Sequence, residues 1–284
     1  MQNHRVPDSD RAYDRPWFPG LAENLVEPAL AQRGLAAGRY GTRRWIETDP
    51  AAPGPAETPA PPLSVLEAPP PSLSAAYAAQ GLRFAGPAGG GEKALLQDAW
   101  ACLGRVPEAG TAVSHLVGAI HLLQSPGPGY DVSHSDPDLP CSVFLSLPVG
   151  EPHAVLRVAE SILHEAMHLQ LTLLEAVAPV VQVGTATLYS PWQQRQRPIG
   201  GLLHGLYVFA AIDAYLAELL ALDDLAAATA AFSAKRRREI AVEIIQAAEV
   251  AEHEDLTPFG RRFAEGLLAA LRRRQGPGGV SAGR

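Results

Sequence analysis

The sequence predicts an α+β fold that is predominantly α-helical, in which a long central helix packs with a small sheet of short strands. Residues 154–177 indicate the helix, because polar side chains recur at helical spacing along one side, the rest is apolar, and Pro179 ends the run. Short β-prone runs bounded by turn formers flank it on both sides. A hydrophobic content of 47% in 284 residues allows a sizeable core.

Three short runs are predicted as strands. The first lies within 113–123, the second covers 142–147 and the third covers 181–189. We expect an extended peptide to pair with an exposed edge of the second strand.

Further helices follow from start and stop signals. Residues 92–103 form one helical run, and Pro198 can occupy the first turn of a helix over 199–222, where a proline loses no intrahelical bond. Ser233 and Thr257 are natural N-caps for two last helices.

Composition divides the chain into three parts. Residues 1–91 form an N-terminal arm and linker, whose aromatic residues should pack on the core and whose proline-rich stretch at 50–71 favours extended segments. Residues 92–274, which contain the histidine motif described below, are expected to form the metal-binding catalytic domain. The glycine-rich end at 275–284 is expected to be a disordered tail.

Charge and composition exclude several partners. Lysine and arginine total 23 against 30 acidic residues, and the net charge of -7 repels phosphate backbones, so nucleic acid is a poor partner. The N-terminus lacks the pattern of a secretory signal, and the apolar stretch 202–222 contains ionisable residues that are costly in lipid. With Cys102 and Cys141 as the only cysteines, we expect a soluble, cytoplasmic protein with free thiols and no membrane partner.

The central helix contains the motif His164-Glu165-Ala166-Met167-His168. The two histidines are four residues apart, so their imidazoles project from one helix face and suit two adjacent positions on one metal ion. In the simpler alternative, the histidines and the other polar residues of this helix form the solvent-exposed face of an amphipathic helix. We prefer the metal, because so apolar a helix belongs at the centre of the domain, where a polar stripe needs a partner.

A third metal ligand must come from elsewhere in the chain. His204 and Glu218 compete for this role, and both cannot bind one ion, because 14 residues of helix separate them by about 21 Å at about 1.5 Å per residue. The metzincin pattern is excluded, since Leu171 and Leu174 occupy the places of its glycine and histidine. We prefer His204, since the glycines beside it, Gly200, Gly201 and Gly205, permit close packing of its helix.

Donors gather just before the helix that carries His204. Arg195 and Arg197 precede its N-terminus, a place that attracts anions, and either guanidinium could clamp the far carboxylate of a metal-chelating dicarboxylic acid. For each arginine alone, an ordinary surface role is the simpler interpretation.

These motifs together resemble the HExxH-type 2-oxoglutarate-dependent peptide β-hydroxylases, which modify ribosomally synthesised precursor peptides. The resemblance covers about residues 92–272. It rests on the HExxH motif, on Tyr189-Ser190-Pro191-Trp192, on the run from Arg197 to Gly205, and on Ser133-His134-Ser135-Asp136-Pro137.

The resemblance implies an Fe(II) centre that uses 2-oxoglutarate and O₂ to hydroxylate a β-carbon of a precursor peptide. It implies His164, His168 and His204 as iron ligands, a departure from the usual two-histidine, one-carboxylate triad. Arg197, with help from Ser190 or Tyr189, would bind the co-substrate.

Further roles follow for the polar residues around this centre. Glu165 would act in catalysis, as a ligand or in orienting one. His134 and Asp136 would line the path of the peptide, although a turn or capping role is the simpler alternative.

Two other functions remain open at this point. The predicted fold, with the HExxH helix packed on a small sheet, has a zincin-like core. In a zinc metallopeptidase with this fold, Glu165 would be the general base and Glu218 or His204 the third ligand. In a non-catalytic peptide-binding helper, the histidines would hold no metal. The basic run 235–238 would attract an acidic leader peptide or, more simply, form a solvated helix face.

Overall fold

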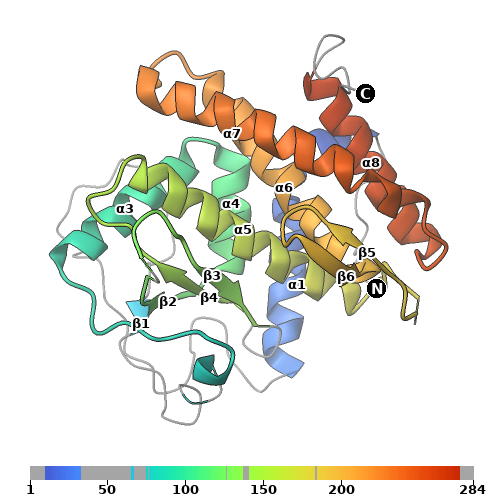
Figure 1. The fold of residues 1–284 in the computed structure, drawn as a ribbon, viewed down its shortest axis with the longest axis horizontal. Coiled ribbons are helices and arrows are strands. Elements are labelled where there is room, and N and C mark those ends of the chain that lie inside the picture. The colour runs from blue at the N-terminus through green and yellow to red at the C-terminus, as the bar shows by residue number, and fades with distance from the viewer. Residues whose placement is uncertain are drawn as a thin grey trace. The chain divides into compact units, whose positions relative to one another are not determined.

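The computed structural model describes residues 10–32, 65–66, 75, 77–125, 127–136, 141–182 and 184–275 (Figure 1). These residues are mostly helical, with a small sheet of short strands, as an α+β class requires. The chain forms two compact units: residues 1–21 with 170–284, and residues 22–169. We call them the C-terminal unit and the sheet unit. The predicted domain organisation, with an arm up to residue 91 and a catalytic domain at 92–274, stays a prediction.

The described residues of the sheet unit form a four-stranded sheet in the order β1-β2-β4-β3. β1 (Val65–Leu66) and β4 (Ser142–Ser146) lie parallel to β2 (Ala119–Leu123), and β3 (Ser133–Ser135) lies antiparallel to β4. β2 and β4 are buried along their whole length, and neither sequence alternates between apolar and polar residues. The polar residues that they contain, His121 in β2 and Ser142 and Ser146 at the two ends of β4, are buried as well.

The predicted strand at 142–147 is confirmed as β4, but the expectation that its edge is exposed is wrong. β4 pairs with β2 on one side and with β3 on the other. β3 is the terminal strand of the described sheet. The run 113–123 is a strand only from Ala119, because α4 (Pro107–Leu116) takes up its first half.

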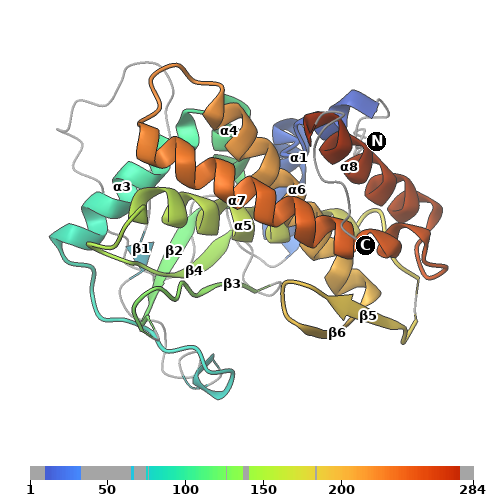
Figure 2. The same ribbon diagram turned by 45° about the horizontal axis from the view of Figure 1, so that its top comes forward.

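Two predicted helices of the sheet unit are confirmed. α3 (Gly90–Gly104) covers the predicted run 92–103, and α5 (Ala154–Glu175) is the predicted central helix. Figure 2 shows α5 running along the sheet. The boundary between the two units falls inside α5, between Leu169 and Gln170.

The C-terminal unit consists mainly of α6 (Ile199–Leu220), α7 (Ala227–Gln246) and α8 (Pro258–Gln275). A hairpin of β5 (Thr187–Ser190) and β6 (Arg195–Pro198) leads directly into α6. The predicted strand 181–189 was therefore wrong in its first part, where Val181 forms only an isolated bridge with Leu256. A short 3₁₀ helix, Ala248–Glu252, precedes α8.

The predicted N-caps of the last two helices have different outcomes. Thr257 caps α8, since its hydroxyl accepts a hydrogen bond from the Gly260 N–H at 2.9 Å and Pro258 is the first helical residue. Ser233 is not a cap, because α7 already begins at Ala227. The alanine-rich stretch before Ser233 favours helix and extends α7 upstream, leaving the serine buried inside it.

The N-terminal segment belongs to the C-terminal unit through its aromatic side chains. Trp17 is fully buried and donates its indole N–H to the Ala211 carbonyl oxygen at 3.2 Å, while Tyr13 packs edge-on against Phe263 of α8. Gln170 donates to the carbonyl oxygen of Phe18 at 3.2 Å, which explains a polar residue outside the polar stripe of α5. The helix α1 (Pro19–Gln32) follows this segment.

Three helices of the C-terminal unit meet at one buried carboxylate. Asp213 of α6 is completely buried and pairs with Arg237 of α7 at 2.9 Å and with Arg274 of α8 at 2.8 Å. The basic run 235–238 is therefore not simply a solvated face, since Arg237 turns inward and Arg236 lies over the Phe209 ring, 5.5 Å from its centroid. Attraction of a leader peptide by this run stays a prediction.

Glycines of α6 allow side chains of the preceding hairpin to pack closely against the helix backbone, in line with the close packing that the sequence predicted. A Cβ at Gly205 would lie 2.5 Å from the Trp192 ring, which stacks on Phe209 with centroids 5.1 Å apart. A Cβ at Gly201 would lie 3.1 Å from Nη2 of Arg197. Gly200 is different, because a Cβ there would make an ordinary contact of 3.6 Å.

Within the described residues, α6 is the helix with the length and composition of a membrane span. Of its most apolar window, 78% is buried inside the protein, as in the core helix of a soluble protein. Other expectations lie outside the described residues: most of the proline-rich stretch 50–71, the aromatic residues Tyr40 and Trp45, and the tail after residue 275.

Candidate metal and co-substrate site

His164 and His168 form a close pair on α5. Their ring centroids are 4.8 Å apart with an interplanar angle of 67°, and both residues are partly exposed. Helical spacing produces this arrangement, because residues four apart stand one above the other. The two rings suit two adjacent positions on one metal ion.

Glu165 points into a different environment from the histidines beside it. Its two carboxylate oxygens accept hydrogen bonds from the hydroxyls of Ser133 and Ser135, at 2.6 and 2.7 Å, and the residue is 3% exposed. Nε2 of His164 lies 3.9 Å from Oε1 of Glu165. The carboxylate therefore joins α5 to the terminal strand β3, and we call this arrangement the Glu165–serine latch.

The two residues predicted to line the path of the peptide, His134 and Asp136, contact other side chains of the sheet unit. Asp136 accepts a hydrogen bond from the hydroxyl of the buried Tyr77. The His134 ring packs against Tyr77 and Phe144, with centroids 5.8 and 5.9 Å away. These contacts agree with a role in shaping the end of β3, and contact of either residue with a peptide stays a prediction.

His204 lies in the C-terminal unit and has an acidic partner. Its Nε2 lies 3.1 Å from Oε2 of Glu175, the last residue of α5, and both side chains are partly exposed. A metal-bound imidazole usually has such a carboxylate on its second nitrogen. Because His204 and the pair on α5 belong to different units, the convergence of three imidazoles stays a prediction.

Glu218, the competing candidate for the third metal ligand, already forms an ion pair. Its carboxylate pairs with Arg15, with Nε and Oε1 2.5 Å apart. A carboxylate in such a pair would have to leave its arginine before it could bind a metal.

The β5–β6 hairpin gathers two guanidinium groups around one neutral side chain. Arg195 donates from Nε and Nη2 to Oε1 of Gln193, at 3.1 and 2.9 Å, and Arg197 donates from Nη1 to the same oxygen at 3.1 Å. Ser190 is buried and its hydroxyl accepts from the Gln193 backbone N–H at 3.3 Å. Tyr189 is 47% exposed on β5.

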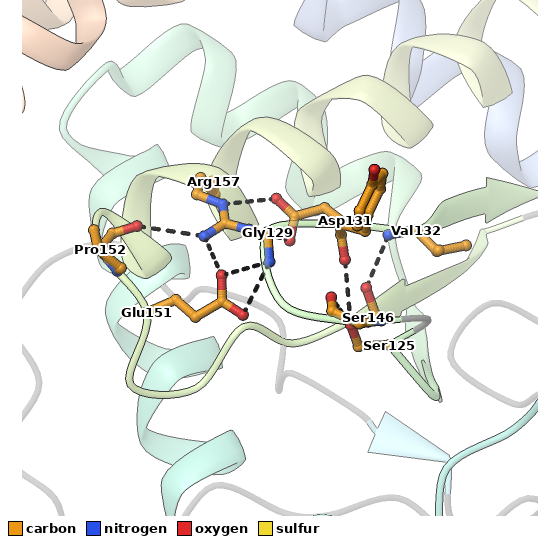
Figure 3. A network of polar contacts seen from close by, with 10 residues as sticks. Ser125, Gly129, Asp131, Val132, Ser146, Glu151, Pro152 and Arg157 are labelled. Atoms are coloured by element: carbon orange, nitrogen blue, oxygen red, sulfur yellow. Dashed lines mark hydrogen bonds and ion pairs between the residues drawn. The ribbon is translucent and has the colours of Figure 1, made fainter.

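An ion-pair network fixes the loop that leads into β3 (Figure 3). Arg157 of α5 donates to both oxygens of Asp131 and to Glu151, each at 2.8 Å, and Glu151 also accepts from the Gly129 N–H. Hydrogen bonding to Asp131 raises the pKa of Arg157, and hydrogen bonding to Arg157 lowers the pKa of Glu151. Arg157 therefore holds the approach to β3 against the start of α5.

This network predicts a loss of stability in acid. Because the pKa of Glu151 is lowered in the folded protein, its carboxylate stabilises the fold above the usual pKa of 4.5, and this contribution fades as pH falls through the lowered value. We expect Glu151→Gln to lower the melting temperature at pH 7 and to melt like the unsubstituted chain at the acid end. Thermal melts across pH 2.5 to 7 test this, and a constant difference across that range would contradict it.

Among the described residues, no group of three or more His, Cys, Asp or Glu side chains is arranged to hold a metal ion. A scan against protein-family models finds no match, and no curated protein matches the sequence.

Sequence reasoning did not assign four partner residues of the candidate site residues. Ser133 and Ser135 were noticed only as part of a motif, and their contact with Glu165 spans about thirty residues that no periodicity connects. Gln193 lay within the donor-rich stretch but had no assigned role. Glu175 was part of the predicted polar stripe of α5, and its spacing from His164 and His168 was the available signal.

Proposed function

We propose that this chain is an Fe(II)- and 2-oxoglutarate-dependent oxygenase that hydroxylates a β-carbon of a residue in a ribosomally synthesised precursor peptide. The sequence resemblance to peptide β-hydroxylases supports the proposal, and so does the close pair of imidazoles on α5. The finer part of the fold prediction, a zincin-like core, belongs to the same proposal.

The Glu165–serine latch is the observation that favours an oxygenase over a peptidase. A general base must reach the water that it deprotonates, and its carboxylate must be available to accept the proton. Both oxygens of Glu165 already accept hydrogen bonds from serines, and the side chain is almost fully buried. This arrangement suits a carboxylate that orients the helix bearing the ligands.

His164, His168 and His204 would hold the iron in this proposal, with Glu175 orienting His204. The bound iron would couple the oxidative decarboxylation of 2-oxoglutarate by O₂, which yields succinate and CO₂, to insertion of the second oxygen atom into a C–H bond of the peptide. Arg195 and Arg197 would bind the distal carboxylate of 2-oxoglutarate.

The peptide would add to the outer edge of β3. The backbone N–H of Ser146 donates to the Val132 carbonyl oxygen at 2.8 Å, which marks these residues as a hydrogen-bonded pair of an antiparallel ladder. By alternation the polar backbone groups of Ser133 and Ser135 point away from β4. An extended peptide could pair with them while their hydroxyls hold Glu165 beside the histidines.

Anaerobic reconstitution with Fe(II), followed by measurement of bound iron and of succinate released from 2-oxoglutarate in air, tests the proposed function. We expect about one iron per chain and succinate release that increases with a peptide encoded beside this gene. Zinc-dependent cleavage of the peptide without succinate would favour the peptidase. A chain that holds no stoichiometric metal would favour the non-catalytic helper.

A further inference from the structure

We propose that Gln193 is the positioning residue of an anion site, in which its side-chain oxygen holds Arg195 and Arg197 together to receive one carboxylate. The inference rests on the proposed function for the identity of the ligand, the distal carboxylate of a five-carbon dicarboxylic acid. The site itself rests on contacts inside the C-terminal unit.

The charges at this place are unbalanced. Three N–H groups of two guanidiniums converge on a single amide oxygen, at 2.9 to 3.1 Å. Neither arginine forms an ion pair with any carboxylate of the described residues. Two cations held around a neutral acceptor repel each other, and an arriving carboxylate would relieve that repulsion while forming charge-assisted hydrogen bonds.

The surrounding backbone positions these side chains at the surface, where Gln193 and Arg195 are exposed and Arg197 is partly exposed. Arg195 and Arg197 alternate with Gln196 along β6, so they share one face of the hairpin. The hydroxyl of the buried Ser190 receives the Gln193 N–H and fixes the turn that carries this side chain. Arg197 lies against Gly201 in the first turn of α6, where a larger residue would displace it.

Gln193→Glu gives a sharp test, because it changes a neutral acceptor into a carboxylate of the same shape. The new carboxylate would pair with both arginines and occupy the site from within the chain. We expect the affinity of the metal-free chain for glutarate, measured by calorimetry, to fall about tenfold or more, with an unchanged or higher melting temperature. If Gln193 only stabilised the hairpin, the substitution would not lower glutarate affinity while leaving the melting temperature unchanged or higher.

Gln196→Glu is the matched control, since it makes the same change of net charge on the opposite face of β6. We expect it to change glutarate affinity by no more than about twofold at 0.15 M salt, where screening acts over about 8 Å. The inference is overturned if the two variants bind glutarate equally, or if the unsubstituted chain does not bind it.

A second arm separates this inference from the proposed function. The chain loaded with Fe(II) under anaerobic conditions should bind 2-oxoglutarate more tightly than glutarate, because only the 2-oxo acid can also chelate the metal. Equal affinity for both acids would count against the oxygenase and leave the anion site standing. Weaker binding of both acids to Gln193→Glu supports the site in either case.

Discussion

Replacing Asp213 by alanine should destabilise the protein by about 3–5 kcal/mol, the usual cost of removing one partner from a buried ion pair. Asp213 is completely buried, and it pairs with Arg237 and Arg274, whose side chains are only 20% and 12% exposed. Without the carboxylate, two guanidiniums would face each other with little water to screen them. Urea unfolding followed by circular dichroism would measure the change.

Glu218→Gln is the control for Asp213→Ala, because it removes a carboxylate from the same helix. Its partner Arg15 is 54% exposed and Glu218 is 34% exposed. An exposed pair contributes about 1 kcal/mol or less. Similar losses for the two variants would show that Asp213 does not hold α6, α7 and α8 together as its contacts indicate.

The second large effect is expected on metal binding. His168→Ala should lower iron affinity by more than about a hundredfold, beyond the 10- to 100-fold cost of losing an outer partner of a ligand. Glu165→Gln should keep iron and retain much of the succinate release, because the amide can still accept a hydrogen bond from one serine of the latch. Metal analysis and the succinate assay on the same preparations provide both readouts.

His115→Ala provides the control for His168→Ala. His115 lies in the last turn of α4, is partly exposed, and has no predicted role, so its loss should leave the iron content unchanged. If His168→Ala binds iron as well as His115→Ala does, the HExxH motif is not the metal site. If Glu165→Gln keeps its metal and loses all turnover, the glutamate takes part in the reaction and the peptidase regains support.

Periodicity predicted the elements that bury a continuous apolar face. α5 and α6 begin and end within a few residues of the predicted bounds. Prolines flank α5, whose apolar residues recur at helical spacing, whereas Pro198 marks the start of α6, which is apolar on almost every side. β4 was predicted because a buried strand is a short apolar run closed by a proline.

Two of the missed strands, β3 and β6, are polar and depend on their neighbours, while the third, β1, is an apolar pair of residues inside the proline-rich stretch. β3 is Ser-His-Ser and β6 is Arg-Gln-Arg-Pro, neither of which has the β-branched or aromatic content of a typical strand. β3 is stabilised by backbone pairing with β4 and by hydrogen bonds from its serine hydroxyls to Glu165. β6 forms because it pairs with β5, the preceding strand of the hairpin. Pairings of this kind follow from the assembled fold, so no local pattern in the chain could have predicted them.

The stacking of Trp192 on Phe209 gives the hairpin an optical signal of its own. Trp192 precedes Gln193 in sequence, and its indole ring can pack directly on α6 because Gly205 has no side chain. Indole emission responds to nearby charge, so filling the space between the two arginines would shift the fluorescence of a chain in which the other tryptophans are replaced by phenylalanine. Trp192 would thus report the binding of an anion at the proposed site without an attached dye.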